Sequence, residues 1–226
     1  MNKTIVGLSL LLATQTAIAA DGNFTVKAEL KIFGDTVVAM IPQGKTYHRD
    51  TILVKNNKFT ATLHVDEPKD IYFLSMETLH RKENKQLRIV AVPGETLELK
   101  GDVTTRYDIG GTKFYQQYGQ FDRQLETAQK ALNDLGERLS QRIKAGEDRS
   151  KVMDEYEAKA PALEKKVNDA IVGFIKQHAD WEASAAAVVA LGKDEIEEGV
   201  SLLSNTVKSG RMKTYYQNII KAYKEE

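Results

Sequence analysis

The sequence predicts an α+β protein in which an N-terminal antiparallel β-sandwich or rolled sheet is followed by a long helical hairpin and short helices. Between Phe24 and about Tyr107, alternating apolar and polar residues are broken by turns, which is typical of a small antiparallel β-domain. Beyond Gly110-Gly111 the apolar spacing becomes alternately four and three residues, as in an amphipathic helix. A second helical pattern follows a short break at 145–148, so two helices can cover each other's apolar stripes.

Turn residues divide the β-region into about six to eight expected strands, a count taken from their spacing. Gly34-Asp35 ends the first strand, and Asn56-Asn57 predicts a tight hairpin turn because asparagine tolerates a positive φ. Pro93-Gly94 supplies the turn between the last two strands. The apolar stretches predict strands over residues 24–32, 36–41, 52–55, 59–65, 71–76, 87–92 and 96–99.

Two apolar seams define the expected hairpin, with Thr112 as the candidate N-cap of its first helix. Pro161 lies inside the second seam and is expected to kink that helix or to mark its start. The first seam consists of Phe114, Tyr118, Phe121, Leu125, Ala128, Leu132, Leu135 and Leu139. The second consists of Val152, Tyr156, Ala160, Leu163, Val167, Ala170 and Phe174.

The N-terminal residues have the three-part pattern of a signal peptide over residues 1–20. Lys3 gives a positive start, Ile5 to Leu12 is apolar, and Ala17-Ile18-Ala19-Ala20 offers an Ala-x-Ala cleavage site. The apolar run is shorter than the roughly 20 residues that a membrane anchor needs. Because no cysteine follows the cut, no lipid anchor is expected. We therefore expect a periplasmic or secreted protein that does not insert into the membrane after cleavage.

The mature chain is expected to have two parts. The β-domain covers residues 21–109, and the helical region covers residues 110–226. Within the helical region the hairpin takes up about 112–178, and shorter apolar-faced segments over 180–226 form a helical cap on it.

Charge and cysteine content exclude several classes of protein. The chain has 32 basic and 32 acidic residues, so it lacks the basic excess of a nucleic-acid-binding protein. It contains no cysteine, so a disulfide framework is excluded and stability must come from a core.

We assign no catalytic, cofactor-binding or metal-binding residue from the sequence. The four histidines, at positions 48, 64, 80 and 178, lack the spacing that presents two metal ligands on one face, and surface or capping roles are expected for them. Gly110-Gly111-Thr112-Lys113 is a β-to-α junction, not a complete phosphate-binding loop. The acidic runs at 194–198 and 225–226 are expected to be solvated, although a pair of carboxylates brought together by the fold stays open as a hydrolytic site.

Aromatic residues give the one indication of a binding groove. Several tyrosines gather in the β-region and at its junction with the first long helix, where they could line a groove. The alternative is that they belong to the core, as aromatics at strand or helix spacing often do. The candidate groove residues are Tyr47, Tyr72, Tyr107, Tyr115 and Tyr118.

Several short motifs carry a resemblance to a known family. Lys58-Phe59-Thr60-Ala61, the stretch from Val92-Pro93-Gly94-Glu95 to Asp102, and Ile109-Gly110-Gly111-Thr112 occur in this order. This order resembles the uncharacterised β-rich N-terminal domain, a domain of unknown function, that precedes the thioredoxin-like domain of exported bacterial thiol-disulfide oxidoreductases. The stretch from Phe174 to His178 is similar to the helix that follows in those proteins. Thiol chemistry does not carry over, because the 226 residues hold no Cys-x-x-Cys of a thioredoxin-like domain.

Three functions follow as hypotheses. The first is a non-enzymatic exported binding or interaction module of the cell envelope, accessory to a thioredoxin-like protein, whose partner is an envelope protein or a peptide docked on a sheet edge. The alternative is a carboxylate-dependent hydrolase that acts on an envelope substrate. The third is a structural role in which the helical hairpin forms a homo-oligomer.

Overall fold

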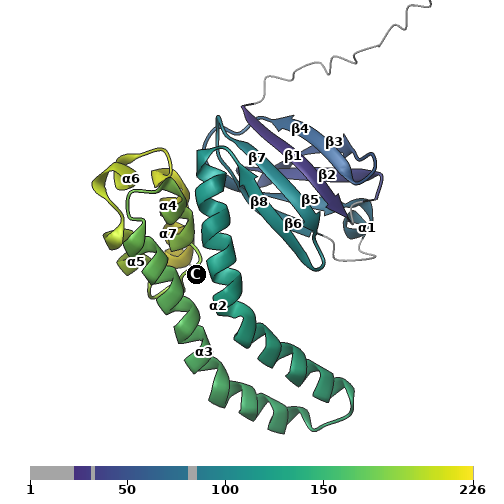
Figure 1. Cartoon of the computed structure of the whole chain (residues 1–226), viewed down its shortest axis with the longest axis vertical. Coiled ribbons are helices and arrows are strands. Elements are labelled where there is room, and N and C mark those ends of the chain that lie inside the picture. The colour runs from purple at the N-terminus through teal and green to yellow at the C-terminus, as the bar shows by residue number, and fades with distance from the viewer. Residues whose placement is uncertain (1–22, 32–33, 81–85, 226) are drawn as a thin grey trace, which may run out of the picture.

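The computed structural model describes residues 23–31, 34–80 and 86–225. These residues form two stacked β-sheets, a long helical hairpin and a group of short helices, in that order along the chain (Figure 1). The α+β class and the order of its parts are therefore as the sequence predicts. The expected signal peptide at 1–20, Ile32 of the first expected strand and the last acidic residue, Glu226, lie outside the described residues.

The sandwich contains two four-stranded sheets with the strand orders β4-β1-β7-β8 and β3-β2-β5-β6. Strands β1 and β7 pair in parallel, and the other described strand pairs are antiparallel. The strands are β1 (Phe24–Lys31), β2 (Thr36–Gln43), β3 (Thr46–Leu53), β4 (Lys58–Leu63), β5 (Lys69–Ser75), β6 (Gln86–Ala91), β7 (Thr96–Asp102) and β8 (Arg106–Gly111). A short helix, α1 (Met76–Leu79), follows β5.

Alternation along the strands fills the space between the two sheets. In β1 every second residue from Phe24 to Leu30 is buried, as its sequence pattern predicts. Phe59 of β4 meets Phe73 of β5 across the sandwich, with ring centroids 5.7 Å apart. Aromatic and branched side chains from both sheets therefore form one continuous core.

The three expected turns are present, and the chain passes from one sheet to the other at each of them. Asn56 and Asn57 have φ of 52° and 61°, and Lys55 and Lys58 exchange backbone hydrogen bonds of 2.9 Å around them. The strands on either side, β3 and β4, belong to different sheets. Pro93-Gly94 likewise joins β6 of one sheet to β7 of the other, and Gly94 has a φ of 81°. The turn residues were predictable, whereas the crossing between layers was not.

Strand β8 and most of β3 were not expected. Within β3 only Ile52 is buried, and within β8 only Ile109, so neither strand shows a clear alternation of apolar residues. Both strands exist because they pair with a neighbour, β3 with β2 and β8 with β7.

Helices α2 (Lys113–Lys144) and α3 (Arg149–Gln177) form the expected antiparallel hairpin (Figure 1). The break lies at the expected residues, and the Asp148 side chain caps α3 by accepting a bond of 2.8 Å from the Ser150 N–H. Thr112 is the N-cap residue of α2 but makes no capping bond with its hydroxyl, which accepts instead from the Thr96 N–H at 3.0 Å. The helix runs through Pro161, so this proline does not mark its start.

The first half of α2 covers one open side of the sandwich. Strands β6 and β8 are the edge strands on that side of the two sheets, and Phe114, Tyr115 and Phe121 of α2 are buried there. At Gly119 a Cβ atom would lie only 2.3 Å from the backbone oxygen of Ile109 in β8. Glycine therefore lets the helix approach the strand closely. Strands β3 and β4 form the opposite side, away from the hairpin and the short helices that follow it (Figure 1).

Four short helices form the expected cap at the base of the hairpin. They are α4 (Glu182–Val188), α5 (Ile196–Leu202), α6 (Asn205–Ser209) and α7 (Lys213–Glu225). Six consecutive residues of α4, from Ala183 to Val188, are buried between the hairpin and the rest of the cap. Among the described residues, no helix is long and apolar enough to cross a membrane.

The hairpin extends beyond the main core and has a small core of its own. Leu135, Leu139, Val152 and Ala160 form this separate cluster of buried residues. We call the part of the hairpin around it, residues 130–163, the distal arm. Figure 1 shows the distal arm projecting away from both the sandwich and the cap.

Candidate functional site

The structure does not gather the five candidate tyrosines into one groove. Tyr47 lies on β3 and is 51% exposed, on the side of the sandwich away from the helices. Tyr115 is buried in the core, where its hydroxyl donates to the Val90 backbone oxygen at 2.6 Å. Tyr47 therefore lies apart from the junction between the sandwich and the helices, and Tyr115 is enclosed in the core.

The other three tyrosines lie nearer to that junction. Tyr72 is on β5, directly across from Arg88 of β6. Tyr107 is partly buried on β8, and Tyr118 lies on α2 between Phe114 and Phe121. Tyr118 lines a junction cavity of about 180 Å³, and Tyr107 lines a neighbouring cavity of about 220 Å³. The expected aromatic groove is thus replaced by two small, separate cavities.

The junction cavity contains an ion pair of the sandwich that is hydrogen-bonded to the cap. The Arg88 Nη2 atom lies 2.6 Å from the Asp70 Oδ2 atom, and the Tyr215 hydroxyl of α7 donates to Asp70 Oδ1 at 3.1 Å. The hydrogen bond to Asp70 raises the pKa of Arg88, and burial raises the pKa values of Tyr118 and Tyr215. The arginine stays charged and the two phenols stay neutral at physiological pH. The arrangement therefore acts as a structural tether.

A second tether centres on Arg211, in the turn before α7. Its guanidinium donates to the Pro93 backbone oxygen at 3.0 Å, to Glu182 of α4 at 2.7 Å, and to Glu95. Glu95 also accepts from the Thr112 hydroxyl. Burial opposes the charged form of Glu95, but these hydrogen bonds outweigh it and lower the pKa of this carboxyl. One arginine thus holds the β6–β7 turn, the start of α2 and the cap together.

The cavity beside Tyr107 contains the strongest candidate for carboxylate chemistry. It is lined by Asp122 and Glu126, one turn apart on α2, and by Arg106, the first residue of β8. The Arg106 Nη1 atom lies 2.6 Å from Glu126 Oε2. Burial raises the pKa of Asp122, and the nearby charge of Glu126 raises it further. A carboxyl with a raised pKa beside a second carboxyl is a pattern found at hydrolytic sites, although it also occurs in structural clusters.

The four histidines make local contacts in the structure. Across the described ranges, no group of three or more His, Asp or Glu residues is placed to hold a metal ion. His178 caps the end of α3, as expected, and stacks on Trp181 with ring centroids 3.8 Å apart. His48 contacts the Asp50 carboxylate, and His64 contacts the Asp66 carboxylate. His80 is the C-cap residue of α1.

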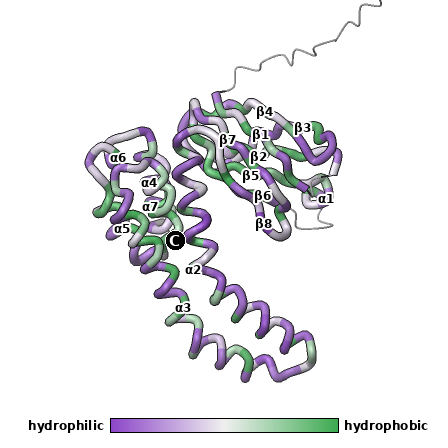
Figure 2. The backbone as a smooth tube through the Cα atoms, viewed as in Figure 1, coloured by the Kyte–Doolittle hydropathy of each residue, from purple (hydrophilic) through white to green (hydrophobic). Residues whose placement is uncertain are grey.

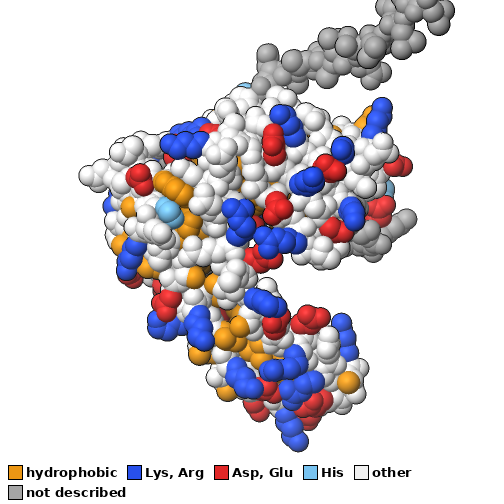
Figure 3. Space-filling view, in the orientation of Figure 1, with side chains coloured by type: hydrophobic (Ala, Val, Ile, Leu, Met, Phe, Trp, Pro, Cys, Tyr) orange, Lys and Arg blue, Asp and Glu red, His pale blue; other side chains and the backbone are white. Residues whose placement is uncertain are grey.

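The distal arm has an open apolar groove between its two helices. The groove has a volume of about 380 Å³. Met153, on the edge of the groove, is 39% exposed. Figure 2 shows hydrophobic stretches among the polar residues of the arm, and Figure 3 shows hydrophobic side chains on the surface of the hairpin. The groove is lined by Gly136, Leu139, Ser140, Ile143, Lys144, Val152, Met153 and Tyr156.

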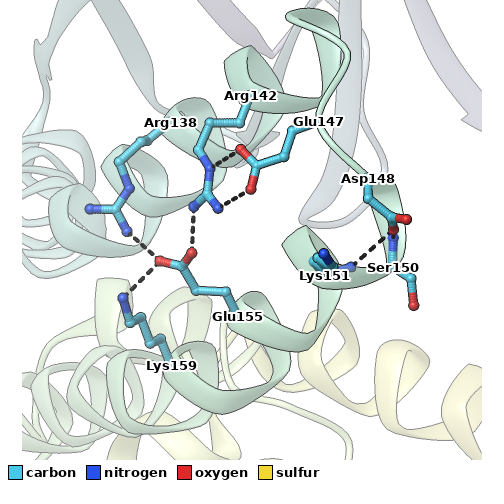
Figure 4. A network of polar contacts seen from close by, with 8 residues as sticks. All are labelled: Arg138, Arg142, Glu147, Asp148, Ser150, Lys151, Glu155 and Lys159. Atoms are coloured by element: carbon cyan, nitrogen blue, oxygen red, sulfur yellow. Dashed lines mark hydrogen bonds and ion pairs between the residues drawn. The ribbon is translucent and has the colours of Figure 1, made fainter.

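A network of ion pairs fixes the tip of the distal arm (Figure 4). Arg142 of α2 holds Glu147 with two bonds of 2.6 and 2.7 Å and also bonds Glu155 of α3. Glu155 accepts further bonds from Lys159 at 2.7 Å and Arg138 at 3.2 Å. The bonds from Lys159 and Arg142 lower the pKa of Glu155 to about 2. These contacts bridge the two helices and hold the loop between them, so the tip has a defined shape.

Comparison with known proteins gives no relative. No family model, no curated protein and no solved structure matches the chain.

Proposed function

We propose that the protein is a non-catalytic interaction module of the bacterial cell envelope whose distal arm binds a helix of a partner protein. The observation that carries this proposal is the open apolar groove on an arm that projects beyond the main core. A hairpin that served only to complete the fold would need no such extension, because the main core already encloses the base of α2 and α3.

A third helix is the occupant that suits this groove. Two antiparallel helices bury only part of their apolar stripes against each other, and another helix packing into the groove completes a bundle. Ile143 and Tyr156 line the groove and are only partly buried. At Gly136 a Cβ atom would meet nothing within 4 Å, so the groove wall leaves room for a closely packed helix.

The tip network supports binding by restricting the arm before a partner arrives. Arg142 and Glu155 connect the two helices close to the groove. A surface that is already ordered loses less conformational entropy on binding, and this strengthens the complex. Figure 3 shows an open notch between the sandwich and the distal arm, so the arm is accessible to a partner from that side as well.

The cellular location is part of the proposal and rests on the sequence pattern of residues 1–20. We expect the mature protein to begin at Ala20 or Asp21 and to occur in the soluble envelope fraction. The resemblance in sequence motifs favours a thioredoxin-like protein as the class of partner. Mass spectrometry of the exported protein tests the location, and an intact Met1 in that fraction would contradict it.

The partner proposal is tested by affinity capture from envelope extract with a groove variant and a matched control. Met153→Glu places a charge at the exposed edge of the groove, whereas Ala158→Glu adds the same charge at an exposed position of α3 outside the groove lining. We expect a defined partner that binds wild type and Ala158→Glu but not Met153→Glu, and that binds again as a purified protein. Capture that is equal for all three proteins, or absent for wild type, would refute the proposal.

The same variants test self-association through the hairpin. If the partner is a second copy of the chain, light scattering at high concentration will show a dimer for wild type and Ala158→Glu but a monomer for Met153→Glu. A monomer in every case leaves a different protein as the partner.

The second candidate function is a carboxylate-dependent hydrolase at the Asp122 cavity. Residues one turn apart on a helix have Cβ atoms about 5 to 6 Å from each other, which is compatible with paired carboxylate catalysis. In this hypothesis Asp122, with its raised pKa, is the acid and Glu126 is the second carboxyl group. The test is release of soluble fragments from purified cell-wall material by wild type but not by Asp122→Asn. No release by wild type would remove this candidate.

A further inference from the structure

The free edge of strand β3 is a surface that the helical hairpin leaves uncovered. In its sheet β3 is the last strand, with β2 on one side and no described strand on the other. The opposite side of the sandwich, formed by β6 and β8, lies under α2, whereas β3 lies on the side away from the hairpin (Figure 1). At eight residues β3 is longer than the common strand of about five or six, so another strand has room to pair along it.

The backbone polar groups of alternate β3 residues point away from β2. In an antiparallel pair, residues that exchange both hydrogen bonds with the neighbouring strand alternate with residues that exchange none. The Val54 N–H donates to the Asp35 oxygen at 2.9 Å, so this pair is of the bonded kind. By the register of β2 and β3, every second residue before Val54 also bonds to β2. The residues between them direct their N–H and C=O groups outward, and these are Tyr47, Arg49, Thr51 and Leu53.

The side chains on this edge are suited to contact with another strand. Tyr47 is 51% exposed and Leu53 is 70% exposed, and the alternation of the strand puts both on the same face. Arg49 lies between them, is exposed, and has no acidic partner among the described residues. The other free edge, β4, differs because its exposed residues are Lys58, Thr60 and Thr62. Apolar side chains on an edge strand favour pairing, whereas lysine on an edge discourages it.

A second copy of the chain does not match this edge. Two antiparallel β3 strands must pair outward-directed residues with outward-directed residues. The register that brings Tyr47 of each copy opposite Leu53 of the other also places Asp50 opposite Asp50. Centring the pair one residue earlier opposes two arginines, and centring it one residue later leaves Tyr47 beyond the end of the other strand. Because like charges directly opposite destabilise a strand pair, the complementary strand belongs to a different protein.

We propose that the β3 edge binds an extended segment of a partner protein as an added antiparallel strand. A strand pairs with the outward N–H and C=O groups, whereas a helix already uses its own backbone groups internally. Directly opposite side chains contact each other, so the segment needs apolar residues opposite Leu53 and Tyr47 and an acidic residue opposite Arg49. In the antiparallel direction this is an apolar residue, an acidic residue four positions later and a second apolar residue two positions after that. The arm groove shares no residue with this edge, so the two proposals are independent.

The test is fluorescence anisotropy with the full mature chain and three synthetic nine-residue peptides. Each peptide has phenylalanine at positions 2 and 8, glutamate at position 6 and threonine elsewhere. The first peptide is unmodified. The second carries N-methyl groups at positions 4 and 6, whose N–H groups face β3 in the proposed pairing, and the third carries them at positions 3 and 5, whose N–H groups point away. Methylation removes the donors and leaves every side chain unchanged.

A matched pair of proline variants tests the protein side of the pairing. Thr51→Pro removes an outward N–H that makes no bond to β2, so the ladder within the sheet is kept. The control is Thr60→Pro on β4. The Leu30 N–H donates to the Asn57 oxygen at 2.8 Å, so the same alternation directs the Thr60 N–H outward as well. Circular dichroism melts verify that both variants are folded.

We expect the first and third peptides to bind wild type and Thr60→Pro alike. The second peptide should bind wild type about tenfold or more weakly than the first, and Thr51→Pro should bind the first peptide weakly to the same degree. Equal binding of the second and third peptides to wild type would overturn the proposal, because it would leave apolar attraction as the cause, and this comparison does not depend on any variant. No binding of the first peptide to wild type would overturn it too. A wild-type dimer in light scattering that Thr51→Pro abolishes would overturn it in favour of a second copy.

Discussion

Replacing Leu139 by alanine should open the distal arm while leaving the sandwich intact. Leu139 is 4% exposed and packs with Leu135, Val152 and Ala160 in a cluster separate from the main core. Because the two cores share no buried residue, a loss of packing in one need not reach the other. The variant therefore tests whether the arm is a distinct structural unit.

The expected cost follows from the setting of the side chain. Truncating a buried leucine to alanine costs about 2 to 5 kcal/mol, depending on how far the site can collapse. Leu139 borders the open groove, where neighbouring side chains can relax, so we expect about 2 to 3 kcal/mol. This free energy corresponds to about a 30- to 150-fold increase in the equilibrium constant for opening of the arm.

Hydrogen exchange followed by mass spectrometry measures this opening segment by segment. Peptides from residues 130–163 should exchange faster by about that factor, and peptides from β1, β5 and β7 should be unchanged. The control is Lys130→Ala, an exposed residue whose ion pair with Asp134 spans 3.4 Å, and it should cost less than about 0.5 kcal/mol. Equal acceleration in the sandwich, or none in the arm, would refute the view that the arm has its own core.

Three further predictions concern charged residues. Glu155 has a pKa lowered to about 2, so its stabilising effect is complete above its ordinary value of 4.5 and is lost as the pH falls through 2. Exchange in the arm should therefore quicken between these pH values in wild type and much less in Glu155→Gln. Arg211→Met keeps the apolar stem but removes the tether to Glu95, and it should lower the melting temperature and speed exchange in α7. Asp122 has a raised pKa, so burial disfavours its charged form at neutral pH. Asp122→Asn should raise the melting temperature at pH 7, and the difference should disappear below pH 3, where the wild-type carboxyl is protonated.

The elements with strong periodicity were predictable from the sequence. Strand β1, the break between α2 and α3 and the seam positions Leu135, Leu139 and Val152 all follow from apolar spacing. The degree of burial along the seam was less predictable. Leu132 is only partly buried, because the arm has two helices and no third layer to cover this position. Leu132→Asp should consequently destabilise the arm less than a charge at Val152 would.

The candidate surfaces depend on contacts that spacing does not reveal. Arg211 reaches Glu95 across 116 positions of the sequence, and Tyr215 reaches Asp70 across 145. The tyrosines were expected to share a groove, but Tyr115 became core because α2 closes the side of the sandwich.

The most direct test of the account is photo-crosslinking of the distal arm in living cells. A photoreactive amino acid replaces Ser140, an exposed residue that lines the arm groove, and in a second strain it replaces Lys166, which lies on α3 outside the distal arm. The account predicts one discrete crosslinked product from position 140 that disappears in the Met153→Glu background, and none from position 166. The absence of a product at position 140, or a product unaffected by Met153→Glu, would contradict the claim that the arm groove binds a partner.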